Sequence, residues 1–316
     1  MRKNIFKNFY KGRVICIGQR FQSAVFPTLD IKTPITGRCL CGSVAPLPQS
    51  LYICPLFTDG MKRLISFIIR KIPRPVLQRF AHIVLPVVGL FYRGNKVECT
   101  VCGSTFRKFM PYGRKPPRPN ALCPNCLALE RHRLMWLYLQ EKTDFFTREQ
   151  RLLHIAPEVC FIGRFKKLSN LDYVTGDLES PLADHHFDVH EIPFEDNSFD
   201  VAFCNHVMEH VEDDIKAMSE IYRVLKPGGW AIMQSPQDFT RQETYEDPSI
   251  TDPKAREEAY WQADHVRLFG LDYGKRMEKA GFQVVEDTFV KDMPAQRAER
   301  HALPTEEIIY LCKKVG

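Results

Sequence analysis

A strand, a helix and a second strand are predicted between residues 188 and 236 by the pattern of apolar positions. Residues 200–204 and residues 230–234 form two short apolar segments, as expected for buried strands. The helix between them is indicated by apolar residues that recur at three- and four-residue spacing: Ile215, Met218, Ile221, Tyr222 and Leu225. It is expected to stop at the Lys-Pro-Gly-Gly of residues 226–229. Because strand–helix–strand crossovers are right-handed, the two strands are predicted to lie parallel in one sheet.

Similar elements are predicted on both sides of this unit. Apolar patterning predicts strands at 151–156, 171–174, 283–290 and 306–313, and helices at 127–142 and 271–280. Apolar strands that alternate with helices are typical of a sheet covered by helices on both faces. The predicted fold class is therefore α/β.

Charge is unevenly distributed along the chain, although the net charge of the 316 residues is only +6. Residues 61–120 hold 13 Lys or Arg and one acidic residue, whereas residues 121–316 hold 23 basic and 35 acidic residues. An acidic C-terminal part repels a polyanion, so nucleic acid is a less favoured partner than a small molecule.

The basic N-terminal part has two interpretations. Residues 61–96 alternate basic residues with apolar clusters, which suits either peripheral contact with anionic lipids or packing on the main domain. No apolar run reaches the roughly 20 residues of a membrane-spanning helix. Residues 1–60 lack sustained periodicity, and one hypothesis is that translation starts at Met61. Eleven cysteines without a cleavable signal sequence indicate a cytoplasmic protein, which lipid binding would place on the inner face of the membrane.

Two Cys-x-x-Cys pairs predict a metal site. Cys99 and Cys102 are separated by twenty residues from Cys123 and Cys126, and each short turn presents two sulfurs to one ion. Four thiolates complete the tetrahedral coordination of Zn²⁺ and leave no open position, so a structural zinc is expected. The basic and aromatic loop between the pairs either binds a phosphate-bearing ligand or is a solvated loop around the metal.

The C-terminal half resembles the class I S-adenosylmethionine-dependent methyltransferases of the type 11-like group. The resemblance is carried by PFEDNSFDVAF at 193–203, by the Asn-His that follows, and by YRVLKPGGW at 222–230. The turn HIAPE at 154–158 is similar to that of a bacterial subgroup with an N-terminal four-cysteine module, often associated with surface-glycan genes.

This resemblance implies an architecture and a division of the chain. The expected fold is a Rossmann-like sheet of seven strands preceded by a small zinc-ribbon-like module. The expected segments are an N-terminal extension at 1–60, a basic amphipathic segment at 61–96, a zinc-binding module at 97–130, a linking helix at 131–150 and a methyltransferase domain at 151–316.

The resemblance also implies S-adenosylmethionine as the cofactor, bound where the parallel strands end. Asp177 is expected to bind the ribose hydroxyls, and Asp188 with the backbone of Val189 the adenine. The turn after the first strand lacks glycine, which argues against a dinucleotide pyrophosphate more than against a cationic sulfonium nucleoside. The residues expected at the cofactor site are His154, Ala156, Glu158, Asp177, Leu178, Asp188, Val189 and Asn205.

Candidate catalytic residues lie in two later segments. His206, Glu209 and His210 share a helical face, so a general base with an orienting partner is predicted. A metal site formed by these three residues, or a packing role for His210, is the alternative. His265 and Arg267 follow an irregular, lid-like stretch at 237–253. His265 is a candidate proton acceptor and Arg267 a candidate clamp for an anionic acceptor. The alternative is that Asp264 and Arg267 only pair with each other to start the next helix.

The sequence therefore predicts an S-adenosylmethionine-dependent methyltransferase that acts on a small-molecule or glycan-type acceptor, such as a lipid-linked surface polysaccharide. Two alternatives stay open at this point. One is an RNA base methyltransferase, because bacterial ribosomal RNA guanine methyltransferases also join four zinc ligands to this fold. The other is a non-catalytic binding protein, because the turn after the first strand lacks the usual glycines.

Overall fold

The computed structural model of the protein describes residues 89–113 and 117–316. The predictions made for residues 1–60, for most of the basic segment at 61–96, and for residues 114–116 of the basic loop lie outside these ranges. No helix among the described residues is long and apolar enough to cross a membrane.

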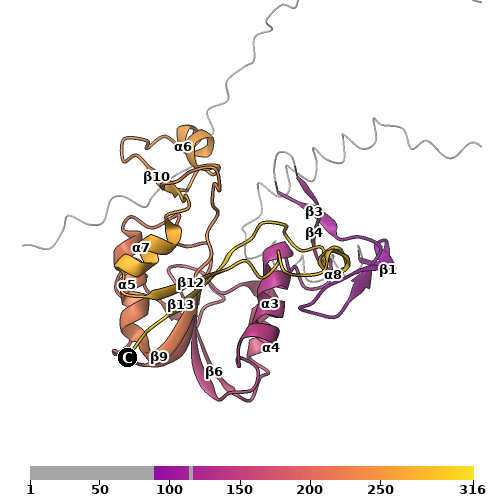
Figure 1. Ribbon diagram of the computed structural model, residues 1–316, viewed down its shortest axis with the longest axis horizontal. Coiled ribbons are helices and arrows are strands. Elements are labelled where there is room, and N and C mark those ends of the chain that lie inside the picture. The colour runs from indigo at the N-terminus through magenta and orange to yellow at the C-terminus, as the bar shows by residue number, and fades with distance from the viewer. Residues whose placement is uncertain (1–88, 114–116) are drawn as a thin grey trace, which may run out of the picture. The chain divides into compact units, whose positions relative to one another are not determined.

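Seven strands form one mixed sheet in the order β12-β13-β9-β8-β5-β6-β7 (Figure 1). Strands β5 to β9 pair in parallel, whereas β13 runs antiparallel to both β9 and β12. This arrangement is the Rossmann-like methyltransferase fold, and it confirms the predicted fold class. The strands are β5 (Gln150–Ile155), β6 (Leu171–Asp177), β7 (His185–His186), β8 (Phe199–Cys204), β9 (Leu225–Ile232), β12 (Gln283–Asp287) and β13 (Ile309–Lys313).

Helices cover both faces of this sheet, two on each side (Figure 1). Leu152 and Phe203 belong to the apolar core under α3 and α4, whereas Leu153 and Ala202 belong to the core under α5 and α7. Because neighbouring residues of a strand point to opposite faces, the central strands have no exposed position, which explains their continuous apolar runs. The helices are α3 (Glu130–Lys142), α4 (Val159–Phe165), α5 (Asp214–Val224) and α7 (Tyr273–Lys279).

Two predicted helix ends are corrected by the structure. Helix α5 ends one residue earlier than predicted, because Leu225 already belongs to β9 and is paired with Phe199. Helix α3 begins at Glu130 rather than at residue 127, because Leu127 has a left-handed backbone, with φ 64°. A left-handed residue cannot continue a right-handed helix, so the chain turns there before α3 starts.

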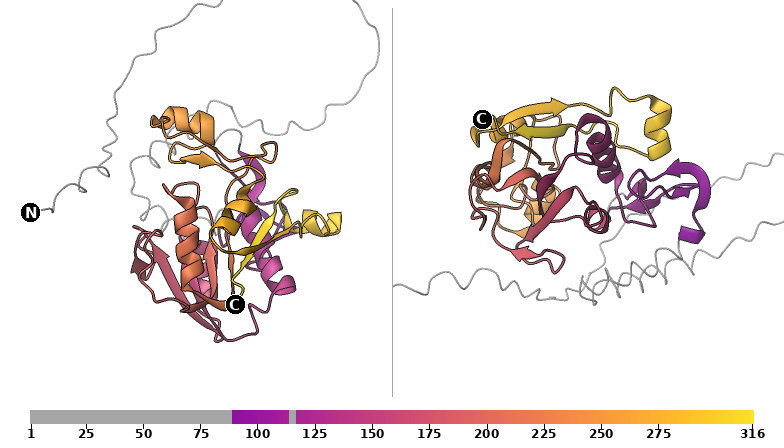
Figure 2. Two further views of the ribbon diagram at one scale, coloured as in Figure 1. Left: turned by 60° about the vertical axis from the view of Figure 1, so that its left-hand side comes forward. Right: turned by 90° about the horizontal axis from the view of Figure 1, so that it is seen from below.

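A small module of two antiparallel strand pairs precedes α3. Strand β1 (Arg93–Glu98) pairs with β2 (Thr105–Phe106), and β3 (Met110–Tyr112) pairs with β4 (Arg118–Leu122). Helix α8 (Ala295–His301), which comes from the C-terminal part of the chain, lies beside β1 (Figure 2).

Arg133 of α3 joins this module to the rest of the protein. The side chain is fully buried, and its guanidinium donates to the carbonyls of Ala121 at 2.8 Å and Ala128 at 3.1 Å, both in the module. It also donates to the carbonyls of His301 and Ala302, each at 2.6 Å. A buried cation satisfied by four carbonyls fixes two parts of the chain to one helix.

The chain between β9 and α7 forms a separate small subdomain that is not part of the seven-stranded sheet (Figure 1). Strand β10 (Tyr245–Glu246) pairs with β11 (Arg267–Leu268) in an antiparallel manner, and α6 (Pro253–Tyr260) lies between them in sequence. This segment contains the stretch predicted to be a lid, and it carries His265 and Arg267.

Candidate active site

The residues predicted for the cofactor follow neighbouring parallel strands. Glu158 lies three residues after β5, Asp177 is the last residue of β6, and Asn205 comes directly after β8. Since parallel strands end at the same edge of a sheet, these side chains gather there, where ligands bind in such folds.

The turn after β5 takes a shape that glycine usually provides. Ala156 has φ 51°, in the left-handed region, and its backbone N–H donates to the carbonyl of Gly176 at 2.8 Å. This conformation costs a residue with a side chain about 1–2 kcal/mol. In this chain the turn forms without a glycine, at the cost of this strain.

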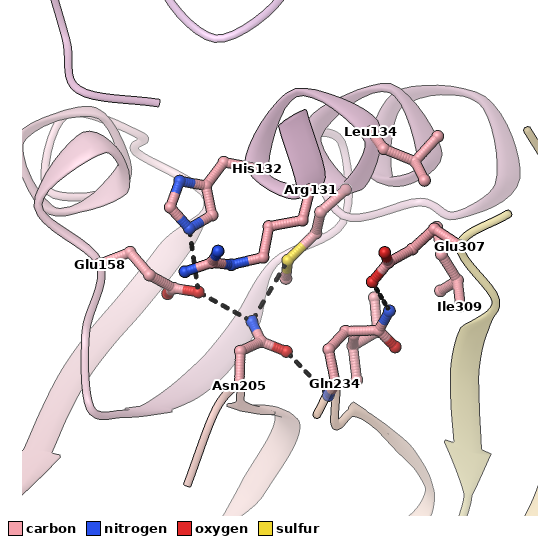
Figure 3. Close-up of a pocket in the computed structure, with 10 residues that line it drawn as sticks. Arg131, His132, Leu134, Glu158, Asn205, Gln234, Glu307 and Ile309 are labelled. Atoms are coloured by element: carbon pink, nitrogen blue, oxygen red, sulfur yellow. Dashed lines mark hydrogen bonds and ion pairs between the residues drawn. The ribbon is translucent and has the colours of Figure 1, made fainter. Parts of the chain in front are cut away.

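Glu158 is held in an ionised state by its neighbours, of which His132 and Asn205 are drawn in Figure 3. Its Oε1 accepts from Asn205 Nδ2 at 3.0 Å, and its Oε2 contacts Nε2 of the fully buried His154, whose Nδ1 lies 2.9 Å from the Tyr173 hydroxyl. Burial alone would raise the pKa of Glu158, but the interactions with His154, His132 and Asn205 outweigh it and lower the pKa to about 2. Glu158 is therefore a carboxylate at neutral pH.

A pocket opens beside Glu158 between α3 and the strand ends (Figure 3). Two of its side chains, Arg131 and His132, were not among the residues that the sequence predicted for the site. Arg131 Nε and His132 Nε2 are buried and have no hydrogen-bond partner among the described residues. The pocket is lined by Arg131, His132, Leu134, Met135, Glu158, Asn205, Ile232, Gln234, Glu307 and Ile309.

Asp177 and Leu178 lie at the open end of β6. One carboxylate oxygen of Asp177 accepts from the backbone N–H groups of Glu179 at 2.9 Å and Ser180 at 2.7 Å, which fixes its orientation. The Leu178 side chain is 57 % exposed. An ordered carboxylate beside an exposed apolar side chain suits a ribose next to a base.

Asp188 and Val189 follow the edge strand β7. The carboxylate of Asp188 accepts from the backbone N–H of His190 at 2.9 Å and lies 2.6 Å from its Nδ1, whereas Val189 is buried. The backbone N–H of Phe187 donates to the carbonyl of Asp177 at 3.2 Å. This bond places Asp188, the residue predicted to bind adenine, close to Asp177, the residue predicted to bind ribose.

His206 and Glu209 form a pair just after β8. His206 Nδ1 lies 3.2 Å from Glu209 Oε1, and Glu209 Oε2 accepts from the Ser235 hydroxyl at 2.9 Å. Burial would raise the pKa of Glu209, but the hydrogen bond from His206 outweighs it and the pKa is lowered. His206 is itself left-handed, with φ 57°, and local strain of this kind is common at functional sites.

The lid-like segment brings a second histidine to this group. The rings of His210 and His265 meet edge to face with centroids 4.7 Å apart. His210 Nδ1 lies 3.2 Å from the carbonyl of Asp264, and His265 Nδ1 lies 2.9 Å from the carbonyl of Tyr260. The sequence placed these histidines 55 residues apart, and the fold makes them neighbours.

Arg267 is engaged within the protein. Its guanidinium donates to the carbonyls of Met208 at 2.8 Å, Val211 at 2.6 Å and Glu212 at 2.9 Å, and to the Glu246 carboxylate at 2.9 Å. Arg267 is buried, with 4 % of the residue exposed. Arg267 is thus neither a free anion clamp nor paired with Asp264, and its contacts instead hold the lid-like segment on the loop after β8.

The four cysteines of the two predicted pairs come together. Cys99 Sγ lies 3.6 Å from Cys126 Sγ, and Cys102 Sγ lies 3.7 Å from Cys123 Sγ. All four are free thiols, and their sulfurs lie within 4.8 Å of one another. Four sulfurs at about 2.3 Å from a tetrahedral Zn²⁺ are roughly 3.8 Å apart, so the cluster fits this ion.

Known proteins match mainly the strand-rich part of the chain. Residues 151–233 match the family model described as "Methyltransferase domain". A demethylmenaquinone methyltransferase of Chlorobaculum tepidum is 34% identical over 82 residues, 26% of this chain and 29% of that protein. An uncharacterised 37.1 kDa protein in a transposon of Streptomyces fradiae is 45% identical over 49 residues, 16% of this chain and 14% of that protein. The chain thus spans less than a third of the length of these relatives.

Among solved structures, a putative methyltransferase from Bacillus halodurans is similar with a TM-score of 0.36 and 18% identity, covering 54% of this chain and 94% of that one. The family match falls on β5 to β9, the parallel strands whose carboxyl ends carry Glu158, Asp177 and Asn205. Residues 151–233 of the chain are therefore identified as a methyltransferase domain.

Proposed function

We propose that the protein transfers a methyl group from S-adenosylmethionine to a small-molecule or glycan-type acceptor. The observation that carries this proposal is that two side chains line one pocket at the strand ends: an ionised Glu158, and Arg131, whose Nε has no hydrogen-bond partner among the described residues. The amino-acid end of the cofactor carries an ammonium and a carboxylate, and these two side chains complement both charges.

The remaining cofactor contacts follow from the strand ends. Asp177 is oriented to accept from the ribose hydroxyls, and the exposed Leu178 offers an apolar surface for adenine. Asp188 would accept from the adenine amino group, next to the backbone of Val189. S-adenosylmethionine supplies an electrophilic methyl group when bound, so the protein contributes alignment and charge complementarity.

His206 is the candidate general base for an acceptor that loses a proton. Its Nδ1 is bonded to Glu209, and its Nε2 is buried without a partner among the described residues. A carboxylate that accepts from Nδ1–H leaves a lone pair on Nε2 and stabilises the imidazolium formed by proton uptake. This arrangement suits a hydroxyl acceptor.

The chemistry of the pocket favours a polar, uncharged or cationic acceptor over a polyanion. Glu158, Glu209 and Glu307 all lie at this edge of the sheet, and the part of the chain that forms it holds 35 acidic against 23 basic residues. A lipid-linked glycan would also give the basic segment at 61–96 a role at the membrane surface.

The four-cysteine cluster is proposed to hold a structural Zn²⁺. The ion would tie the turn after β1 to the turn after β4, and the Thr100 hydroxyl already donates to the carbonyl of Arg133 at 2.8 Å. With no open position at a four-thiolate ion, the site would support α3 rather than take part in methyl transfer.

Cofactor binding tests the proposal directly. Isothermal titration with S-adenosylmethionine should show weakening of about tenfold or more in Asp177→Ala and Arg131→Ala, because each removes a charge-assisted contact worth roughly 1.5–3 kcal/mol. Asp172→Ala is the matched control, since Asp172 lies exposed at the start of the same strand as Asp177. The absence of binding to the parent protein at millimolar cofactor would favour the non-catalytic alternative.

The acceptor class is tested by following the methyl group. The full-length protein is incubated with methyl-labelled S-adenosylmethionine and either lipid-linked glycan precursors or total RNA from a bacterium. We expect label in the glycan fraction, and less of it with His206→Asn. Label in RNA alone would contradict the proposed acceptor and favour a base methyltransferase.

A further inference from the structure

We propose that Glu209, His210 and His265 bind a divalent transition-metal ion at a site separate from the four-cysteine cluster. Each of the three side chains offers one ligand atom, and these atoms lie within 4.8 Å of one another. Two imidazoles and one carboxylate form the donor set of catalytic zinc sites and of non-haem iron(II) sites. A contraction of at most about 1.4 Å, to the roughly 3.4 Å between ligands of a tetrahedral ion, would complete such a site.

His265 is oriented as a metal ligand. Its Nδ1 lies 2.9 Å from the carbonyl of Tyr260, and because a carbonyl only accepts, Nδ1 carries the proton. The lone pair is therefore on Nε2. This atom is buried, in a residue that is 1 % exposed, and it has no hydrogen-bond partner in the described part of the chain. A histidine whose one nitrogen donates to a backbone carbonyl while the other is free is the usual arrangement around a bound metal.

Glu209 brings the negative charge that a divalent cation requires. The residue is 1 % exposed, and its Oε1 lies 4.0 Å from His210 Nε2. Its Oε2 accepts from the Ser235 hydroxyl at 2.9 Å, so the carboxylate is held by a hydrogen bond that does not involve the proposed ligands. Oε1 has two lone pairs and can accept from His206 while it binds the ion.

The two segments that carry the ligands are held together without a metal. Val266, next to His265, donates its backbone N–H to the carbonyl of Glu209 at 2.9 Å. Arg267 donates to the carbonyls of Met208 and Val211, on either side of Glu209 and His210. The site is thus formed by the fold in advance, which lowers the ordering cost of binding an ion.

One side of the site faces solvent. The side chain of His210 is 35 % exposed, whereas Glu209 and His265 are buried. Three protein ligands leave at least one coordination position for water or for an oxygen of a bound acceptor. The site lies on the loop after β8, next to His206, and therefore beside the pocket at the strand ends.

Cobalt(II) is the probe that separates the two metal sites. The full-length protein is loaded with Zn²⁺ at the cysteines, freed of loosely bound metal by dialysis, and titrated with Co²⁺ while its visible absorption is recorded. We expect one further equivalent of Co²⁺ with a d–d spectrum and no thiolate-to-metal charge-transfer band, because the ligands are nitrogen and oxygen. Cobalt that enters the cysteine site instead is recognised by that band.

His210→Ala and His265→Ala should each weaken this Co²⁺ binding at least tenfold, and His186→Ala, an exposed histidine of β7, should leave it unchanged. Circular dichroism checks folding, and the partly exposed His210 decides the test if the His265 variant does not fold. Absence of the extra equivalent, or its retention in His210→Ala, overturns the proposal. S-adenosylmethionine titration of the same samples is independent, so retained cofactor binding with lost Co²⁺ binding refutes only the metal site.

Discussion

Replacing Glu158 with Gln gives the sharpest test of the electrostatics at the strand ends. Glu158 is 13 % exposed at its side chain, contacts His154, and accepts from Asn205 at 3.0 Å. Glutamine keeps the size of the side chain and an acceptor oxygen but removes the charge. The variant therefore reports how much the negative charge of Glu158 contributes to the free energy of unfolding, with little change in packing.

The magnitude follows from the pKa. A carboxyl whose pKa falls from 4.5 in the unfolded chain to about 2 in the folded protein stabilises the folded state by roughly 3 kcal/mol at pH 7. Because the folded-state pKa lies below the unfolded one, this contribution is complete above pH 4.5 and is lost as the pH falls through 2. At pH 3 roughly 1.5 kcal/mol should remain. The glutamine variant lacks the contribution at every pH.

The assay is urea unfolding of both proteins at pH 7 and at pH 3, followed by circular dichroism. We expect the difference in unfolding free energy between parent and Glu158→Gln to approach 3 kcal/mol at pH 7 and to fall by about half at pH 3. Zinc loss in acid affects both proteins alike and cancels in the difference. A difference that is independent of pH, or a variant more stable than the parent at pH 7, would refute the argument.

Three further outcomes are expected from the structure. Arg133→Met should lower the unfolding free energy by about 4 kcal/mol or more in urea, because four carbonyls lose a charged donor inside the protein. Ala156→Gly should raise the melting temperature slightly by removing up to about 1 kcal/mol of left-handed strain, whereas Ala183→Gly, in an ordinary loop, should not. Cys102→Ser should reduce the zinc content measured by elemental analysis by one equivalent per chain and weaken S-adenosylmethionine binding several-fold.

Apolar periodicity was sufficient for the fold because the central strands are covered on both faces. The pattern at 200–204 and 230–234 placed β8 and β9 in one parallel sheet, and the predicted α/β class is confirmed, as is the seven-stranded sheet that the family resemblance implied. The cysteine pairs were equally informative, because two knuckles of fixed spacing have few geometries other than a common cluster. The predicted helix ends were less accurate, because an apolar pattern does not indicate that Leu127 has a left-handed backbone.

Contacts between segments that are distant in the sequence could not be predicted from the apolar pattern. Arg131 and His132 reach the pocket only because α3 packs over the ends of β5 and β8, and their spacing alone marks an ordinary polar face. Arg267 illustrates the converse error. An arginine after a lid-like loop suggests an anion clamp, but in the fold three carbonyls of the loop after β8 point at it and take its donors.

Helix α3 connects the proposed zinc site to the cofactor pocket through consecutive residues of its first turn. Arg131 and His132 line the pocket, while Arg133 binds carbonyls on both sides of the cysteine turn at 123–126. His132 Nδ1 also accepts from the backbone N–H of Leu129 at 3.1 Å, so the start of the helix is fixed from within the pocket. If the cysteine turn loosens, Ala121 and Ala128 move and Arg133 moves with them. Arg131 then loses its position beside Glu158, and for this reason a structural ion outside the pocket is expected to control cofactor affinity.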